Sequence, residues 1–203
     1  MDNASLRGLP ELYIARHGQT DWNAEGRLQG QVEVPINALG RTQARRNGRC
    51  LQDIFGDRAE TFRYLASPLG RAMETMQLIR EELGLPPEAF ATDDRLIEVG
   101  FGDWQGWTMA ELRQTDPEGI RRRKADKWGF LPPGERGESY AMLAERVRPV
   151  FEALDAPTVL VAHGGVTRSF LALYAGVPGD EAVSTDIPQD RVLHVSGGRL
   201  EWV

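Results

Sequence analysis

The chain has 203 residues, a length that fits one globular domain with a full hydrophobic core. Hydrophobic residues make up 41% and charged residues 27%, as in an ordinary soluble protein, and the formal net charge of −6 excludes a general basic field that would attract nucleic acid. The single cysteine, Cys50, excludes an intrachain disulfide, and no window approaches the roughly 18 apolar residues of a membrane span.

The predicted elements of the first half are a strand over 12–15, a long loop over 19–36, a helix over 38–55, a strand over 62–67 and a helix over 69–83. Asn37 is the expected N-cap of the first helix. Cys50 lies in that amphipathic helix, where we expect a small buried hydrophobe and not a nucleophile.

The predicted elements of the second half are a glycine-broken segment over 96–106 that begins extended, short polar helices within 108–131, a helix over 138–154, a strand over 157–163, a helix over 165–174 and a C-terminal hairpin. The strand over 157–163 carries four apolar residues in a row, as is typical of a central strand covered on both faces. Strands that alternate with helices predict a three-layer α/β/α fold with a mostly parallel central sheet. We expect a single domain over 1–203 with a lid-like insertion at about 100–137.

Polar residues follow three of the predicted strands. Arg16 and His17 follow the first, Ser67 and Arg71 follow the second, and His163 follows the third. Because ligands bind outside the carboxyl ends of strands in an open α/β sheet, these side chains are expected to converge. Arginines fork onto phosphate oxygens and a neutral imidazole attacks phosphorus, so the pattern predicts a phosphate site with a histidine nucleophile.

Two other titratable residues, His194 and Glu98, lie outside this group of strand ends. His194, the third of three histidines, lies in an alternating strand without such neighbours, which favours a surface or packing role. Glu98 follows an apolar stretch, where a carboxyl can serve as a general acid, although residue chemistry alone favours an exposed strand-end glutamate. No metal-ligand cluster is visible in the sequence.

Five motifs in order resemble one family. They are "ARHGQTDWNAEGRLQG" (15–30), "INALGRTQA" (36–44), "SPLGRAMET" (67–75), "LIEVGFGDWQG" (96–106) and "VAHGG" (161–165). Together they resemble the histidine phosphatase superfamily, also called the phosphoglycerate mutase-like family, over nearly the whole chain. The resemblance implies that family's fold and an enzyme that needs neither metal nor other cofactor.

The resemblance also implies roles for individual residues. His17 would carry a phosphohistidine, and Glu98 would protonate the leaving oxygen and then activate water. Arg16, Arg71 and His163 would complete the catalytic set by holding the phosphoryl group, and Asn23, Gln29, Gly30 and Gly164 would contact the substrate. Gln105, Glu74 and a longer loop over 132–139 depart from the family pattern and put only substrate contacts in doubt.

A phosphohistidine is the intermediate of both phosphatases and mutases: water hydrolyses it in a phosphatase, and another hydroxyl receives the phosphoryl group in a mutase. Mutases of the family carry a longer insertion between the acid and the second histidine, whereas Glu98 and His163 are 65 residues apart here. They also carry a lysine about eleven residues past the acid, and "WTMAEL" has none. We therefore expect a phosphomonoester hydrolase acting on a small phosphorylated metabolite, with a phosphoglycerate mutase-type phosphotransferase as the alternative. A catalytically idle, ligand-binding member is disfavoured because the catalytic set is intact.

The remaining features of the sequence concern the surface, the location and the partners. The basic run of Arg121, Arg122, Arg123 and Lys124 is either a solvated helix face or a contact for an acidic substrate. Trp104, Trp107 and Trp128 are expected to pack in the core, with an apolar pocket for an organic leaving group as the alternative. The expected location is cytoplasmic, since the N-terminus lacks the apolar region of a signal peptide. We expect no nucleic-acid or membrane partner; a homodimer is compatible with the sequence, which does not determine the oligomeric state or the natural substrate.

Overall fold

The computed structural model describes residues 4–203 and, within them, a six-stranded sheet in the order β3-β2-β4-β1-β5-β6. The strands are β1 (Leu12–Arg16), β2 (Arg63–Ala66), β3 (Ala91–Thr92), β4 (Thr158–Ala162), β5 (Val192–Ser196) and β6 (Arg199–Trp202). The four strands from β3 to β1 in this order run parallel, whereas β5 and β6 pair antiparallel at the other edge. The mostly parallel sheet predicted from the sequence is confirmed.

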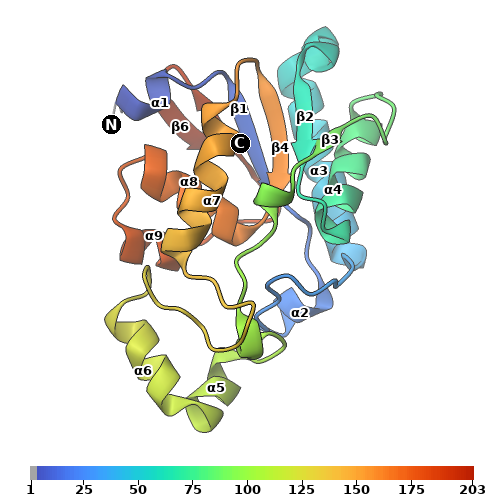
Figure 1. Ribbon diagram of the computed structural model, residues 1–203. Helices are drawn as coiled ribbons and strands as arrows, with labels where there is room; N and C mark the ends of the chain where they lie inside the picture. The colour runs from blue at the N-terminus through green and yellow to red at the C-terminus, as the bar shows by residue number, and fades with distance from the viewer. Residues whose placement is uncertain (1–3) are drawn as a thin grey trace.

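Helices cover both faces of the sheet (Figure 1). They are α1 (Ala4–Arg7), α2 (Asp21–Ala24), α3 (Ala38–Phe55), α4 (Gly70–Glu82), α5 (Met109–Thr115), α6 (Pro117–Ala125), α7 (Tyr140–Glu152), α8 (Gly164–Tyr174) and α9 (Gly179–Ser184). Helices α3 and α4 pack on one face, and α1, α7, α8 and α9 pack on the other. The three-layer α/β/α arrangement is therefore confirmed.

The alternation of side chains along β1 divides the core into two parts. Leu12 and Ile14 pack toward α7 and α8, whereas Tyr13 and Ala15 pack toward α3 and α4. All four are at most 1% exposed, because successive side chains of a strand point to opposite faces and both faces are covered.

The parallel pairing continues past the ends of the strands. Beyond β1, the backbone N–H of His17 donates to the carbonyl of Ala162 at 2.9 Å, and beyond β2 the N–H of Ser67 donates to Val161 at 2.9 Å. Three chain segments therefore leave the sheet in register at one edge.

Some short elements differ from the sequence expectation. The segment 19–36, expected to be a loop, contains helix α2, which Thr20 begins with a capping box to Asn23. Leu96, expected to begin an extended segment, lies in a 3₁₀ turn (Asp94–Leu96), and the strand of this region is β3, two residues long. Such short elements leave almost no hydrophobic period in a sequence.

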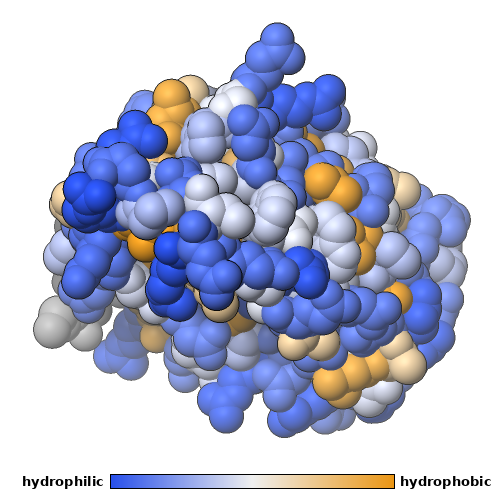
Figure 2. All heavy atoms as spheres, turned by 90° about the horizontal axis from the view of Figure 1, so that it is seen from below, coloured by the Kyte–Doolittle hydropathy of each residue, from blue (hydrophilic) through white to orange (hydrophobic). Residues whose placement is uncertain are grey.

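Segment 100–137 carries α5 and α6 beyond the carboxyl ends of the parallel strands, in the lower part of Figure 1. The face of the molecule seen from below is mainly hydrophilic with separate apolar patches (Figure 2). The segment joins the body where an Asp180 carboxylate oxygen accepts the backbone N–H groups of Lys127 and Trp128, both at 2.9 Å. Trp128 also lies against Gly179, where a Cβ would come within 2.6 Å of its ring.

Three residues test the packing expectations. Trp104 is 2% exposed, as expected, but Trp107 is 42% exposed, so the expectation of core packing is wrong for Trp107. Trp107 lies just before α5, in the segment beyond the carboxyl edge of the sheet. Cys50 is half-buried, not buried, and burial raises the pKa of its thiol, which makes it a poor nucleophile.

Candidate active site

A pocket of about 120 Å³ opens at the carboxyl edge of the sheet. The predicted site residues that line it are Arg16, His17, Asn23, Gln29, Gly30, Arg71, Glu98 and Gly164. His163 lies just beneath, with its ring centroid 5.2 Å from that of His17. The structure thus brings together every residue that the sequence assigned to the site.

A hydrogen bond from one ring nitrogen to the backbone of the next residue fixes the orientation of the His17 side chain. Its Nδ1 lies 2.8 Å from the carbonyl oxygen of Gly18, which can only accept, so Nδ1 carries the proton and Nε2 keeps its lone pair. The side chain is 2% exposed, and burial, followed by the charges of Arg16 and Arg71, holds its pKa well below the usual range. The ring is therefore neutral at neutral pH, as a nucleophile must be.

The loop that carries His17 contacts helix α3 through bare backbone. A Cβ on Gly18 would lie 2.3 Å from the carbonyl oxygen of Gly40, and a Cβ on Gly40 would lie 2.2 Å from the carbonyl oxygen of Gln19. The N–H of Gly18 also donates to the Thr75 hydroxyl at 3.0 Å. Only glycine fits at either position, and α3 and α4 together hold the loop.

Arg16 and Arg71 are anchored by backbone carbonyls and not by carboxylates. Arg16 donates to Ile187 at 2.9 Å, and Arg71 donates to Val32 at 2.7 Å and Gly30 at 2.6 Å. In each side chain the buried Nε has no hydrogen-bond partner among the described residues. Burial lowers the pKa of both guanidinium groups, yet they remain cations because their usual pKa is so high. Both are therefore oriented to receive an anion.

The orientation of His163 depends on Ser67. The His163 Nε2 and the Ser67 hydroxyl oxygen lie 2.7 Å apart, and the hydroxyl already accepts the N–H of Leu69 at 3.4 Å. Since no other acceptor for the buried Ser67 hydroxyl is found in residues 4–203, it donates to Nε2, which places the ring proton on Nδ1. That Nδ1 is buried without a partner, so its N–H is available to a phosphoryl oxygen. Burial and the charge of Arg71 keep the pKa of His163 well below its usual range.

Glu98 is held at the start of α8. Its carboxylate accepts the backbone N–H of Val99 at 2.9 Å and that of Gly165 at 3.0 Å. A Cβ on Gly165 would come within 2.2 Å of the same carboxylate oxygen, so glycine leaves the room that this contact needs. Glu98 is thus an oriented pocket carboxyl and not the exposed strand-end residue that residue chemistry alone favoured.

The substrate-binding candidates surround this centre. The Asn23 Oδ1 accepts Gln189 Nε2 at 3.0 Å and the Thr20 N–H at 3.2 Å, which leaves its amide N–H₂ for a ligand. Gln29 is 6% exposed and its Oε1 has no partner among the described residues. Gly30 has a φ of 54°, in the left-handed region that favours glycine, and its carbonyl anchors Arg71.

Sequence reasoning missed some pocket residues. Arg27, Leu28, Phe101, Tyr140 and Arg168 also line the pocket. Gln189 supports it from behind, because its Nε2 donates to the His17 carbonyl and to Asn23, both at 3.0 Å. Arg168 lies one helical turn after Gly164, and that spacing would have placed it on the same face of α8. Gln189 carries no such signal, since it reaches the site from a distant loop.

The departures from the family pattern lie outside the pocket lining. The Gln105 Oε1 accepts the backbone N–H of Gln31 at 2.8 Å and so supports the loop beside the site. Glu74 pairs with Arg41 at 2.7 Å on the surface. In the loop over 132–139, Glu138 pairs with Arg146 at 2.7 Å.

A parallel α/β sheet whose carboxyl edge gathers two buried neutral histidines, two carbonyl-anchored arginines and an oriented carboxyl defines an enzyme of phosphoryl transfer. The family model "Histidine phosphatase superfamily (branch 1)" matches residues 12–202. The chain belongs to this superfamily, and the resemblance seen in the sequence is confirmed.

The named relatives include both phosphatases and phosphoglycerate mutases. The chain is 35% identical over 180 residues to glucosyl-3-phosphoglycerate phosphatase of Mycobacterium tuberculosis, covering 82% of this chain and 76% of that protein. It is 36% identical to the uncharacterized phosphatase PhoE of Bacillus subtilis, covering 96% and 92%. It is also 34% identical to a 2,3-bisphosphoglycerate-dependent phosphoglycerate mutase of Parvibaculum lavamentivorans, covering 79% and 77%. A solved structure of mycobacterial glucosyl-3-phosphoglycerate phosphatase aligns with a TM-score of 0.74 at 30% identity, covering 95% and 96%.

Residues 4–203 lack both a membrane-spanning helix and a metal-binding cluster. No helix there is both long and apolar enough to cross a membrane. The same residues hold no group of three or more histidine, cysteine, aspartate or glutamate side chains placed to bind a metal ion.

Proposed function

We propose that the protein is a phosphomonoesterase of the cytoplasm that hydrolyses a small phosphorylated metabolite through a phosphohistidine on His17. The observation that carries the proposal is the pairing of an unprotonated His17 Nε2 with the unpartnered N–H donors of Arg16, Arg71 and His163. These donors would hold the phosphoryl oxygens and spread their charge in the transition state.

The reaction would proceed in two displacements. In the first, Nε2 of His17 attacks phosphorus, the bond to the ester oxygen breaks, and Glu98 gives its proton to that oxygen. In the second, Glu98 takes a proton from water, the oxygen of that water attacks phosphorus, and the P–N bond breaks to release orthophosphate. The Glu98 carboxylate oxygen lies 3.0 Å from the Gly165 N–H, at the helix start that would also receive the phosphoryl group.

Segment 100–137 is proposed to act as a lid on this site. Phe101 lines the pocket, and α5 and α6 lie beyond the open edge of the sheet (Figure 1). A lid excludes water from the first displacement and selects the leaving group, so this segment is the expected source of specificity.

Replacement of the nucleophile tests the proposal. We expect His17→Ala to lower kcat for p-nitrophenyl phosphate by about 1,000-fold or more, because no other described side chain offers phosphorus an activated nitrogen. His194→Gln is the matched control, since His194 stacks on Tyr13 at 4.4 Å, outside the pocket. Wild-type turnover in His17→Ala would refute the proposal.

The mutase is the second candidate, favoured by the similarity to the Parvibaculum enzyme. It predicts that 3- and 2-phosphoglycerate interconvert faster than orthophosphate is released. We propose the phosphatase because PhoE, a relative named as a phosphatase, matches 96% of this chain, against 79% for the Parvibaculum mutase, and because the acid and the second histidine are only 65 residues apart. Measuring both rates on the same sample separates the two enzymes.

A further inference from the structure

The pocket carries more positive charge than one phosphoryl group needs. Arg168 lines it together with Arg16 and Arg71. Its NH1 and the Arg16 Nε lie 3.2 and 3.6 Å from the point that a Cβ on Gly164 would occupy, so the two guanidinium groups lie side by side over that glycine. The charge of Arg168 accordingly helps to lower the pKa of Arg16.

Arg168 is held in place without being neutralised. Its Nε donates to the carbonyl of Thr185 at 2.9 Å, and its NH1 lies 3.4 Å from the Tyr140 hydroxyl. It has no carboxylate partner among the described residues. Two neutral contacts therefore aim a full positive charge at the pocket wall beside Glu98 and Gly164.

Arg123 of α6 adds a second uncompensated cation from the lid. The side chain is half-buried, yet residues 4–203 give it neither a hydrogen bond nor an ion pair. Burial and the charge of Arg168 lower its pKa. Tyr140 and Phe101 line both its cavity and the catalytic pocket, so these two rings form the wall between them.

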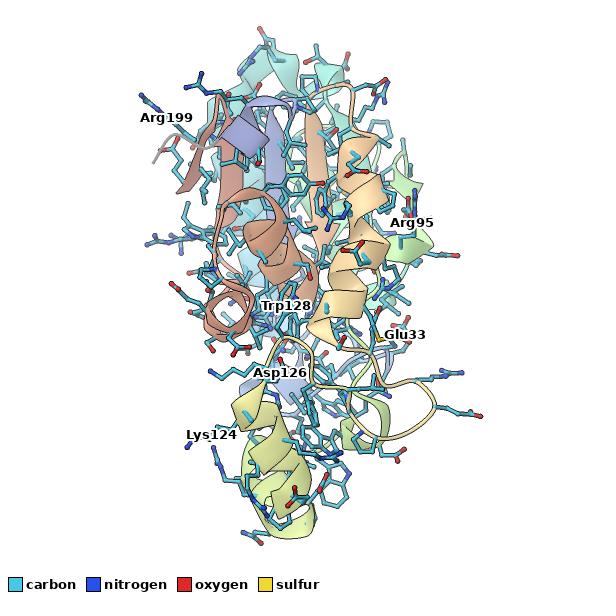
Figure 3. The ribbon with its side chains drawn as sticks, turned by 60° about the vertical axis from the view of Figure 1, so that its left-hand side comes forward. Glu33, Arg95, Lys124, Asp126, Trp128 and Arg199 are labelled. Carbon is cyan, nitrogen blue, oxygen red and sulfur yellow. The ribbon has the colours of Figure 1, made fainter. Side chains whose placement is uncertain are left out.

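The neighbours of Arg123 show that its placement is selective. Arg121 pairs with Glu118 on the helix surface, Arg122 lies over the ring of Phe130 at 5.9 Å, and Lys124 extends from the outer side of α6 (Figure 3). Of the basic run left open by the sequence, Arg123 is the member turned toward the site.

The nearby acids do not cancel these charges. Glu138, which lines the cavity of Arg123, pairs with Arg146 at 2.7 Å. Asp186 and Glu98 act on Arg16 electrostatically, but among the described residues neither forms an ion pair with Arg16, Arg123 or Arg168. Like charges gathered without a paired carboxylate are the mark of an anion-binding site.

We propose that Arg168, with Arg123 behind it, forms a second anion subsite for a carboxylate or second phosphate on the leaving group of the substrate. The inference rests on the proposed function, because it names the substrate class of the same site. Arg16 and Arg71 would hold the transferred phosphoryl group, and Arg168 would hold the anion on the leaving group. Arg123 would add positive charge from behind the wall formed by Tyr140 and Phe101.

The test compares esters that differ in one group. kcat/KM is measured for glycerol 3-phosphate, whose far end is neutral, for 3-phosphoglycerate, which has a carboxylate there, and for 1,3-propanediol bisphosphate. We expect the wild type to prefer an anionic ester over the neutral one by about 10- to 100-fold, as for a hydrogen bond to a charged group. The larger of the two preferences identifies the anion as carboxylate or phosphate.

Substitutions of the subsite arginines test whether the preference for anionic esters depends on this subsite. In Arg168→Met the ratio of anionic to neutral kcat/KM should fall by about 10- to 100-fold, and in Arg123→Met by a smaller factor. Arg168→Lys should keep part of the ratio. The control is Arg121→Met, whose ratio should stay at the wild-type value because Arg121 faces solvent. A loss of rate common to both esters cancels in the ratio.

Two outcomes are kept apart. A wild type without preference, or an Arg168→Met variant with an unchanged ratio, overturns the subsite. Absence of p-nitrophenyl phosphate turnover overturns the proposed function instead, and calorimetric Kd values for the same esters then decide the subsite without turnover: the wild type should bind 3-phosphoglycerate or the bisphosphate more tightly than glycerol 3-phosphate, and Arg168→Met should not.

Discussion

The two buried histidines have different roles because one faces a carbonyl group, which only accepts a hydrogen bond, and the other faces a hydroxyl group, which donates one. His17 faces the Gly18 carbonyl, which accepts, so its free Nε2 is a lone pair that attacks. His163 faces the Ser67 hydroxyl, which donates, so its free Nδ1 is an N–H that binds. The sequence predicted both histidines from their strand ends, but it could not predict the proton positions, since these depend on partners brought close by folding.

Ser67→Ala tests this assignment. We expect kcat to fall by about 10-fold, because without the hydroxyl the His163 ring can shift its proton to Nε2 and lose its donor toward phosphate. Nitrogen-15 NMR of the labelled ring should change from the Nδ1–H pattern to a mixture in the variant.

Ser169→Ala is the control, since it removes another fully buried hydroxyl that has no partner among the described residues. If Ser67→Ala and Ser169→Ala share the same kcat and the His163 ring keeps its tautomer, Ser67 is only a packing residue.

At the scale of elements, the sequence predicts those helices and strands that are determined by neighbouring residues. The sequence predicted strands β1 and β4 and the N-cap of α3 at Asn37, because each depends on a pattern of adjacent residues. Helix α2, strand β3 and the inward turn of Arg123 were not, since each depends on contacts with distant segments. The junction of segment 100–137 with α9 belongs to the second group.

Asp180→Ala tests that junction. The carboxylate accepts the N–H groups of Lys127 and Trp128, so its removal leaves these two exposed donors to water and costs roughly 0.5–1.5 kcal/mol locally. We expect faster limited proteolysis near 126–137 and a KM raised by several-fold, with a smaller change in kcat. Glu181→Ala, at an exposed neighbour, should behave as the wild type. Unchanged proteolysis in Asp180→Ala would show that Asp180 does not hold the lid.

At the scale of the whole molecule, charge is distributed unevenly. The net charge is −6, yet buried and half-buried arginines gather at one edge of the sheet. Composition predicted an acidic protein that needs local cations for an anionic substrate, and the structure contains such a cluster. Without an anion, these cations repel one another and oppose folding.

Orthophosphate should therefore stabilise the fold. At about 100 times its Kd we expect roughly 2.7 kcal/mol, or about 5–10 °C in Tm for a chain of this size. Sodium chloride at equal ionic strength should give a much smaller shift, and Arg71→Met should lose most of the phosphate effect. An equal rise of Tm in Arg71→Met would mean that the anion acts elsewhere.

The backbone contact between Gly18 and Gly40 has a consequence for how this chain can vary. A pocket wall of side chains can be repacked by paired changes, one larger and one smaller, but two glycines have nothing further to remove. A larger residue at one position cannot be compensated by a smaller residue at the other, so neither glycine can be replaced. Attempts to transfer this catalytic loop to another scaffold would have to carry the first turn of α3 with it.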